Sequence, residues 1–171
     1  MSARVRPETG EDREGIVRVL RAAFPTPAEA DLVRMLHEDF ASEIALVAKA
    51  GFRIVGHVML SRMEVTGDGA PIRALGLGPV AVLPARQREG IGSLLIRDAL
   101  RRAGLLGEEM VFVVGDPDYY RRFGFSAETA APFASPYAGP YFMALALAPG
   151  LAPPSEGKAD YAPAFSRLPH R

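Results

Sequence analysis

The sequence predicts a mixed α/β domain in which helices pack on a sheet. Some segments carry apolar residues at helical spacing and others are short apolar runs of the strand type, and the two kinds alternate along the chain. A length of 171 residues with 49% hydrophobic side chains is enough for one domain with a sizeable core and too short for two typical domains. We therefore expect a single α/β domain.

The first predicted elements are two helices. Residues 11–23 and residues 31–36 both place apolar side chains at helical spacing among charged ones. Pro25 and Pro27 stand between the two segments, and proline removes a backbone donor and stops a helix. The pattern therefore predicts two separate N-terminal helices.

Three strands follow in the prediction. The apolar runs 44–48 and 54–60 are separated by Ala50-Gly51, which indicates a hairpin, and residues 66–69 form the next turn. The run 75–83 contains two glycines and a proline. Glycine and proline inside a strand mark a bulge or a close approach to the backbone, so we expect this strand to pair irregularly.

The second half of the chain continues with one helix and two strands. Residues 91–104 are amphipathic and end near a glycine, and residues 110–114 are a continuous apolar run typical of a strand covered on both faces. A short segment, 118–123, leads toward a last strand over residues 141–147. The Pro-rich residues 149–171 are expected to form an extended tail.

Composition excludes several classes of function. Lys+Arg and Asp+Glu number 20 each, so neither a nucleic-acid-binding surface nor a polybasic membrane anchor is indicated. The absence of cysteine excludes thiol catalysis and disulfides, and the chain lacks an apolar run of about 18 residues, the length that spans a membrane. His37, His57 and His170 lack metal-ligand spacing. We therefore expect a cytoplasmic protein that binds no metal, nucleic acid or membrane.

The most informative segment is Pro84-Ala85-Arg86-Gln87-Arg88-Glu89-Gly90-Ile91-Gly92, which joins a strand to an amphipathic helix. Glycines let the backbone approach an anion, and the first NH groups of a helix point at it. The segment therefore predicts a phosphorylated cofactor. A competing dinucleotide motif, Gly76-Leu77-Gly78-Pro79-Val80-Ala81, is discounted because a strand continues where that motif needs a helix to begin.

Two motifs carry a family resemblance. Gln87-Arg88-Glu89-Gly90-Ile91-Gly92 resembles the Gln/Arg-x-x-Gly-x-Gly/Ala signature of the Gcn5-related N-acetyltransferase (GNAT) superfamily, and Tyr120-Arg121-Arg122-Phe123-Gly124-Phe125 resembles its Tyr-x-x-x-Gly-Phe block. The resemblance implies a small bacterial-type member with a GNAT-like acyltransferase fold. Its central, mostly antiparallel mixed sheet would be splayed at the cofactor site and flanked by helices, with residues 1–148 as the N-acetyltransferase domain and 149–171 as a tail packed on or extending from it.

The resemblance also implies acetyl-CoA as co-substrate. The pyrophosphate would lie on the backbone NH groups of residues 87–93, and the pantetheine arm would pair with the irregular strand. A backbone NH near Val82 would act as oxyanion donor. The implied cofactor-binding residues are Val80, Ala81, Val82, Gln87, Arg88, Glu89, Gly90, Ile91, Gly92 and Ser93.

The resemblance makes Tyr120 the candidate general acid for the departing CoA thiolate. The segment Asp116-Pro117-Asp118-Tyr119-Tyr120 is shorter than the family pattern, which leaves open whether Tyr119 or Tyr120 faces the sulfur. The strand before the motif contains no Glu or Asp, so the base found there in some members is missing. Glu64, Asp116 and Asp118 remain candidate bases.

The implied reaction is direct acetyl transfer to a primary amine. A covalent enzyme intermediate is not expected, because cysteine is absent and no serine has a nucleophile context. A non-catalytic acyl-CoA-binding or sensing domain is the alternative, and a longer acyl group also stays open. The acceptor would be shaped by the first two helices and by residues 64–71 and 132–140. Peptide, aminoglycoside, polyamine and amino acid acceptors all fit, and the family suggests a homodimer.

Overall fold

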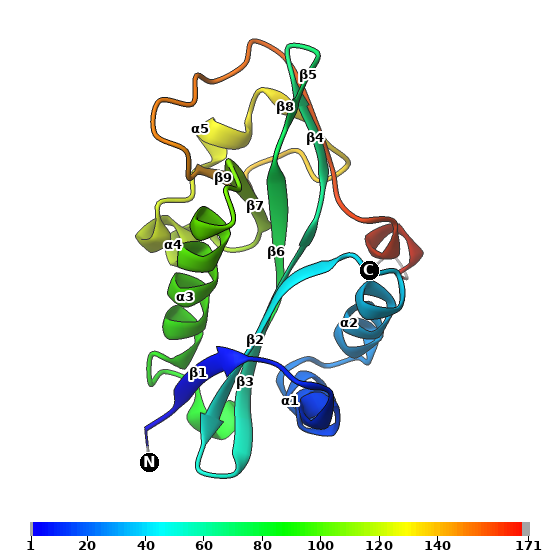
Figure 1. Cartoon of the computed structure of the whole chain (residues 1–171), viewed down its shortest axis with the longest axis vertical. Helices are drawn as coiled ribbons and strands as arrows, with labels where there is room; N and C mark the ends of the chain where they lie inside the picture. Colours follow the sequence, from blue (N-terminus) through cyan, green and yellow to red (C-terminus); the bar gives the residue numbers. More distant parts are fainter. Residues whose placement is uncertain (1, 169–171) are drawn as a thin grey trace.

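The computed structural model describes residues 2–168, and its main feature is a six-stranded sheet (Figure 1). The strand order is β1-β2-β3-β6-β7-β9, and every neighbouring pair is antiparallel except β6 and β7. The predicted mixed, mostly antiparallel sheet is therefore confirmed. Its strands are β1 (Arg4–Pro7), β2 (Ser42–Ala50), β3 (Arg53–Arg62), β6 (Ala74–Val82), β7 (Met110–Val114) and β9 (Phe142–Ala146).

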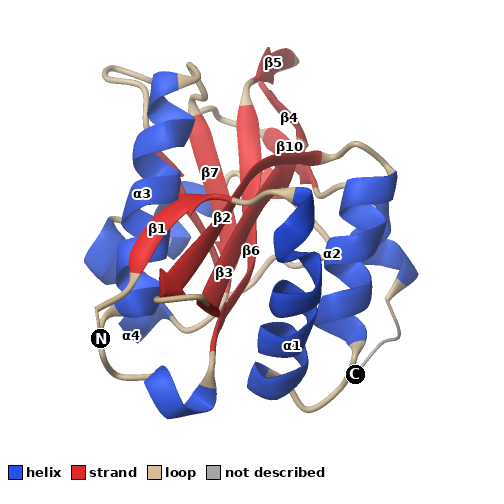
Figure 2. Ribbon diagram, turned by 60° about the horizontal axis from the view of Figure 1, so that its bottom comes forward, coloured by secondary structure: helices blue, strands red, loops and turns tan. Residues whose placement is uncertain are grey.

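Helices cover both faces of this sheet (Figure 2). The helices α1 (Arg13–Ala23) and α2 (Ala28–Glu38), which the two apolar patterns around the prolines predicted, lie on one face. On the other face lies α3 (Ile91–Leu105), which packs on β2, β3 and β6. Gly56 of β3 permits this packing, because a Cβ atom there would lie 2.9 Å from Cδ1 of Leu95.

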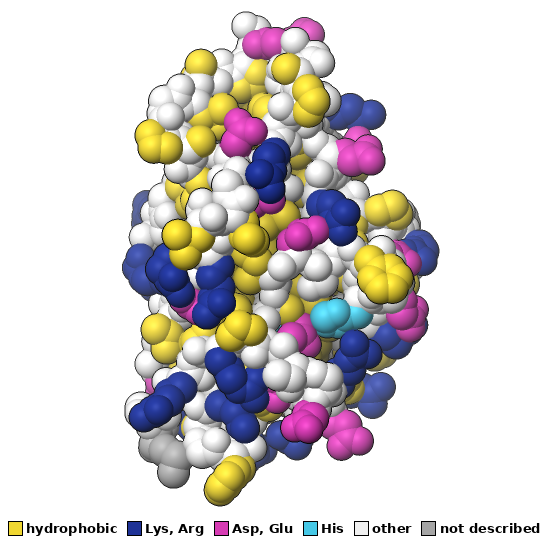
Figure 3. Space-filling view, viewed as in Figure 1, with side chains coloured by type: hydrophobic (Ala, Val, Ile, Leu, Met, Phe, Trp, Pro, Cys, Tyr) yellow, Lys and Arg dark blue, Asp and Glu magenta, His cyan; other side chains and the backbone are white. Residues whose placement is uncertain are grey.

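The outer face of α3 is basic. It carries Arg97, Arg101 and Arg102, and Asp98 forms ion pairs with the last two. Lys and Arg side chains gather on the side of the molecule that carries α3 and β1 (Figure 3). The amphipathic pattern over residues 91–104 therefore predicted this helix.

The sheet opens between β6 and β7. The two strands pair only where Ala74–Leu77 lies beside Met110–Val113, whereas β6 continues along β3 as far as Val82. Beyond Leu77 the second half of β6 has a neighbour on one side only, and its pairing with β3 shifts register near Val58. The glycines and the proline in β6 predicted this irregularity. The opening leaves main-chain groups of β6 available on the side that β7 has left.

A second sheet has the order β5-β4-β10-β8, and the sequence did not predict it. Its strands are β4 (Glu64–Gly67), β5 (Ala70–Ile72), β8 (Phe133–Ala134) and β10 (Gly157–Asp160). Strand β10 lies within residues 149–171, predicted as an extended tail packed on or extending from the domain, and this part of the segment pairs with β4 as a strand. Ala159 of β10 is fully buried, and the backbone NH groups of Ser155 and Glu156 donate to the Asp68 carboxylate of the β4–β5 turn.

Short elements complete the described chain. They are the helices α4 (Pro117–Tyr120) and α5 (Ala127–Ala130) and the 3₁₀ turns at Gly10–Asp12, Pro84–Arg86, Arg121–Phe123 and Pro163–Arg167. Over residues 2–168, no helix is both long and apolar enough to cross a membrane. His170 lies outside the described residues.

Candidate functional site

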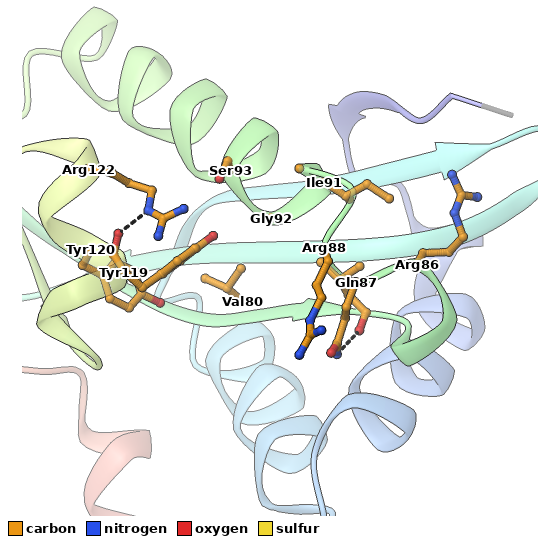
Figure 4. A pocket seen from close by; sticks show the side chains of 12 residues that line it. Val80, Arg86, Gln87, Arg88, Ile91, Gly92, Ser93, Tyr119, Tyr120 and Arg122 are labelled. Carbon is orange, nitrogen blue, oxygen red and sulfur yellow. Dashed lines mark hydrogen bonds between the residues drawn. The ribbon is translucent and has the colours of Figure 1, made fainter.

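A cavity of about 420 Å³ lies between the second half of β6, the N-terminus of α3 and helix α4 (Figure 4). It contains three arginine side chains, and within the described chain its lining includes no carboxylate. This charge favours an anionic ligand. The lining residues are Val80, Val82, Arg86, Gln87, Arg88, Gly90, Ile91, Gly92, Ser93, Tyr119, Tyr120 and Arg122.

The N-terminus of α3 opens into this cavity. Gly90 is the N-cap residue and adopts a left-handed conformation, with φ +83°, which glycine reaches without steric cost. The first intrahelical bond runs from Leu94 N to Gly90 O, so the NH groups of residues 91–93 are those that a helix start leaves without an intrahelical partner. Together with the helix dipole they form an anion site.

The residues of the turn divide into those that face the cavity and those that do not. Arg88 lines it and holds a positive φ of 67°. Glu89, which the motif placed among the cofactor-binding residues, does not line it; its carboxylate accepts a hydrogen bond from Nε of Arg86 at 3.0 Å. The Gln87 amide donates to Val82 O at 3.1 Å and so joins the turn to the end of β6.

The open edge of β6 supplies main-chain groups. Leu83 N donates to Val55 O, and the register pairs Val82 with Gly56. Because antiparallel pairs alternate, the NH groups of Val82 and Val80 point away from β3, toward the gap beside β7. Ala81 has the opposite orientation, is 3% exposed and does not line the cavity. Of the three residues predicted here, Val80 and Val82 are at the cavity and Ala81 is not.

Helix α4 presents two adjacent tyrosines to the cavity. Asp116 starts the helix, because its carboxylate accepts the NH of Asp118 at 2.9 Å. The Tyr120 ring packs edge-on against Phe125, and burial raises the pKa of Tyr120 to about 12. Tyr119 is placed differently, with its hydroxyl 3.1 Å from where a Cβ of Gly92 would stand.

Arg122 was missed as a site residue. Its guanidinium lies over the Tyr119 ring, 4.5 Å from the centroid, and its Nε donates to Tyr119 O at 2.8 Å. In the sequence it could meet cofactor phosphates, as could Arg121, but it was not selected because arginines on a short exposed helix are most often solvated. Arg86 also lines the cavity and was not predicted there.

The three candidate bases lie elsewhere. Glu64 is exposed on β4 of the second sheet, opposite Asp160. Asp116 is occupied with capping α4, and Asp118 is exposed and pairs with Arg121 at 3.1 Å. Within residues 2–168 no group of three or more His, Asp or Glu side chains is placed to hold a metal ion. Among the described residues, the lining of the cavity therefore supplies main-chain donors, positive charge and two tyrosine hydroxyls but no carboxylate base.

Comparison with known proteins agrees with this geometry. A family model described as acetyltransferase (GNAT) domain matches residues 4–127. The uncharacterized N-acetyltransferase YjhQ of Escherichia coli strain K12 is 37% identical over 117 residues, which are 67% of this chain and 64% of that protein. The chain therefore spans slightly less than two thirds of that relative's length.

Two solved structures are similar over nearly their whole length. The GNAT family N-acetyltransferase YhbS of Escherichia coli, in complex with CoA, has a TM-score of 0.87 and 29% identity, covering 100% of this chain and 97% of that one. A GNAT family acetyltransferase of Brucella melitensis, in complex with acetyl-CoA, has a TM-score of 0.78 and 35% identity, covering 95% and 97%.

Proposed function

The chain belongs to the GNAT acetyltransferase family, and on this premise we propose that it transfers the acetyl group of acetyl-CoA directly to a primary amine. One observation carries the proposal. A single cavity brings together the anion-binding start of α3, the open edge of β6 and the Tyr120 side chain. These are a phosphate site, a main-chain donor for a developing oxyanion and a phenolic acid, which is the set that acetyl transfer from a thioester requires.

The pyrophosphate oxygens of acetyl-CoA accept hydrogen bonds from the NH groups at the start of α3. A helix N-terminus stabilises a partly buried anion by up to about 2 kcal/mol, and charge-assisted bonds from NH groups add to this. Arg88 and Arg122 contribute positive charge at the same cavity. The similar proteins YhbS and the Brucella melitensis acetyltransferase were solved with CoA and acetyl-CoA respectively, which supports the same ligand here.

The acetyl group lies along β6, toward Tyr120. The pantetheine arm pairs with the main-chain groups that β7 has left open, and the Val82 NH donates to the thioester oxygen as negative charge builds on it. The amine nitrogen attacks the carbonyl carbon, the C–N bond forms and the C–S bond breaks. The amine proton passes to solvent, the CoA sulfur receives a proton from Tyr120, and solvent then returns a proton to Tyr120.

The raised pKa of Tyr120 defines its role more closely. With a pKa of about 12, the hydroxyl stays protonated throughout the physiological range and is always available as a donor. Full proton transfer to a thiolate with a pKa near 8.5 is uphill by about 5 kcal/mol. Tyr120 therefore donates a hydrogen bond to the sulfur while the C–S bond breaks, and proton transfer is completed late.

The decisive experiment compares Tyr120→Phe with Tyr119→Phe. We expect Tyr120→Phe to lower kcat in a CoA-release assay by about 100-fold, at the lower end of what a general acid contributes, and to leave the Kd of acetyl-CoA within about twofold. Tyr119→Phe is expected to keep most of kcat, since its hydroxyl lies near the start of α3. The reverse pattern would assign the acid to Tyr119.

The same assay tests the alternative function. If the wild-type protein binds acetyl-CoA by calorimetry but releases no CoA with any of a broad panel of amines, the chain is an acyl-CoA-binding or sensing domain. Comparing acetyl-CoA with butyryl-CoA in that assay tests the acyl-chain length.

A further inference from the structure

A second cavity, of about 790 Å³, lies across β6 from the cofactor cavity. It is formed by the start of α2, by residues 136–137 and by the C-terminal residues 160–168. Figure 1 shows this arrangement, with α3 and α4 on one side of β6 and α2 and the C-terminal turn on the other. Much of its wall comes from the segment in which the sequence had predicted only a tail.

The wall of this cavity is aromatic. The ring of Tyr161 meets the ring of Tyr137 edge-on, with centroids 5.3 Å apart, and lies 4.9 Å from the ring of Phe165. Tyr161 also lies directly on β6, because a Cβ atom on Gly76 would be 2.6 Å from its Cε1 atom. Gly76 is one residue before the point where β6 and β7 separate. The aromatic wall therefore ends at the opening of the sheet.

The Tyr161 hydroxyl is a buried polar group on this wall. Its oxygen is shielded from solvent and has no hydrogen-bond partner within the described part of the chain. Burial raises the pKa of Tyr161, and the nearby Tyr137 and Tyr120 raise it further. A buried hydroxyl without a partner costs stability, so a bound polar group that pairs with it would be favoured. The geometry supports a position near Tyr120: Tyr161 lies against Gly76, close to the end of the β6–β7 pairing, and the Tyr120 ring lies against Gly115, which directly follows β7.

The two cavities have opposite charge. The cofactor cavity contains three arginines. The second cavity contains the carboxylates of Glu29 and Asp160, and no Lys or Arg among the described residues lines it. Lys158 approaches Asp160 at 3.4 Å, but it does not line the cavity, and because this exposed pair is weak, a bound cation can replace Lys158 at little cost. Carboxylates beside aromatic rings favour a cationic ligand with a flat or apolar body.

We propose that this cavity is the acceptor site and that it selects a cationic amine: an apolar or aromatic body with the attacking amine at one end and a second positive charge at the other. The Tyr161 hydroxyl holds the attacking nitrogen beside Tyr120, the aromatic wall packs on the body, and Asp160 attracts the distal charge. The inference rests on the proposed acetyl transfer and names the substrate class of that reaction.

Three amines of nearly equal shape test the charge preference. They are 4-(aminomethyl)benzylamine, 4-methylbenzylamine and 4-(aminomethyl)benzoate, whose distal groups are positive, neutral and negative. We expect kcat/KM to fall in that order, by about tenfold between the first and the last, as one screened charge interaction allows. Equal values for the three amines, or the reverse order, would overturn the inference.

Two variants test whether Asp160 causes the preference for a distal positive charge. Asp160→Asn is expected to raise KM for the diamine by about threefold to tenfold and to leave 4-methylbenzylamine unchanged. Asp31→Asn on α2 is the matched control, because that carboxylate is exposed and does not line the cavity, and it should change neither. An Asp160→Asn enzyme that keeps the full preference for the diamine would contradict the assignment.

The Tyr161→Phe variant distinguishes a role of the hydroxyl in amine binding from a role in protein stability. Removing a hydroxyl that has no partner should leave the thermal midpoint unchanged or higher, whereas losing a contact with the attacking nitrogen should raise KM for all three amines by about tenfold. A lowered midpoint with unchanged KM would mean that Tyr161 has a structural role only.

Calorimetry keeps this inference distinguishable from the proposed function. Binding of 4-(aminomethyl)benzylamine to the protein–CoA complex is measured for wild type and Asp160→Asn. Binding that weakens in the variant supports the acceptor site even if no CoA is released, in which case only the catalytic proposal fails. Absent binding, or equal binding to both proteins, overturns the acceptor site while leaving acetyl transfer to other amines to be judged by CoA release.

Discussion

The ring of Tyr120 rests on Gly115: a Cβ atom on Gly115 would lie 2.5 Å from Cε2 of the tyrosine. Gly115 directly follows β7, and the absent side chain lets the ring enter the gap where β6 and β7 separate. The position of the proposed acid therefore depends on a residue that does not itself line the cofactor cavity.

Gly115→Ala should lower kcat. The added methyl group forces the Tyr120 ring to move, and a misplaced catalytic group loses roughly tenfold or more in rate. The Kd of acetyl-CoA should stay within about twofold, because residues 87–93 are untouched. Gly104→Ala is the control: it lies inside α3 with nothing within 4 Å of its Cβ position, so it should keep activity and gain about 0.5–1 kcal/mol of stability. An unchanged kcat in Gly115→Ala would contradict the proposal that Gly115 positions Tyr120 for catalysis.

Gly90→Ala should weaken cofactor binding. A left-handed conformation costs an alanine about 1–2 kcal/mol, and relief of that strain would turn the first NH groups of α3 away from the phosphates. We expect the Kd of acetyl-CoA to rise about tenfold. Gly69→Ala is a matched control, since Gly69 also has a positive φ, 80°, but lies in the β4–β5 turn. Both variants should lose similar stability in urea, and only Gly90→Ala should lose affinity.

Stability should fall in acid because of Glu8. Its carboxylate accepts from His37 Nε2 at 3.0 Å and lies 3.6 Å from Nε2 of the fully buried His57. Burial alone would raise the pKa of Glu8, but the two imidazoles outweigh it and lower the pKa to about 2. Since the folded pKa lies below the ordinary value of 4.5, the contribution is complete above pH 4.5 and is lost as the pH falls toward 2.

That contribution is on the order of 3 kcal/mol, from a pKa gap of about 2.5 units. Urea unfolding of wild type and Glu8→Gln between pH 7 and pH 2.5 measures it. The wild-type free energy of unfolding should exceed that of the variant at pH 7, and the gap should close in acid. The Asp12 carboxylate, whose pKa Arg6 also lowers, is common to both proteins and cancels. If the difference in unfolding free energy between wild type and Glu8→Gln stayed constant with pH, the pKa of Glu8 would not be lowered in the folded protein.

Substitution of Asp68 should weaken binding of the acceptor amine and leave binding of acetyl-CoA unchanged. Its carboxylate accepts the NH groups of Ser155 and Glu156 and so holds β10, which precedes Tyr161. Asp68→Ala removes both bonds and should cost about 1–3 kcal/mol. Asp68→Asn, which keeps an acceptor oxygen and tolerates the positive φ of 49° at this position, should recover part of this.

Kinetics of the two Asp68 variants complete the test. In Asp68→Ala we expect a higher KM for the amine and an unchanged Kd for acetyl-CoA, because the start of α3 is distant in the fold from β10. If KM and Kd rose together, the C-terminal segment would support both cavities alike.

The sequence by itself determined the elements whose signals are local. Helices α1 to α3 and the β2–β3 hairpin show clear periodicity or turn residues, and the irregularity of β6 was readable from its own glycines and proline. The phosphate-binding turn is also local, because a helix start supplies its own NH groups. These features need no distant partner, so neighbouring residues suffice to predict them.

Only the tertiary structure decided which of those residues meet. Strand β10 has four residues and one buried alanine, so no periodicity marks it, and its partners β4 and β8 are distant in the chain. The same holds for the orientation of Val82 against Ala81, which depends on pairing with β3, and for Tyr161, whose place on Gly76 follows from β10. Long-range pairing is set by the sum of many contacts, and a short segment carries too little of that sum to show it in sequence.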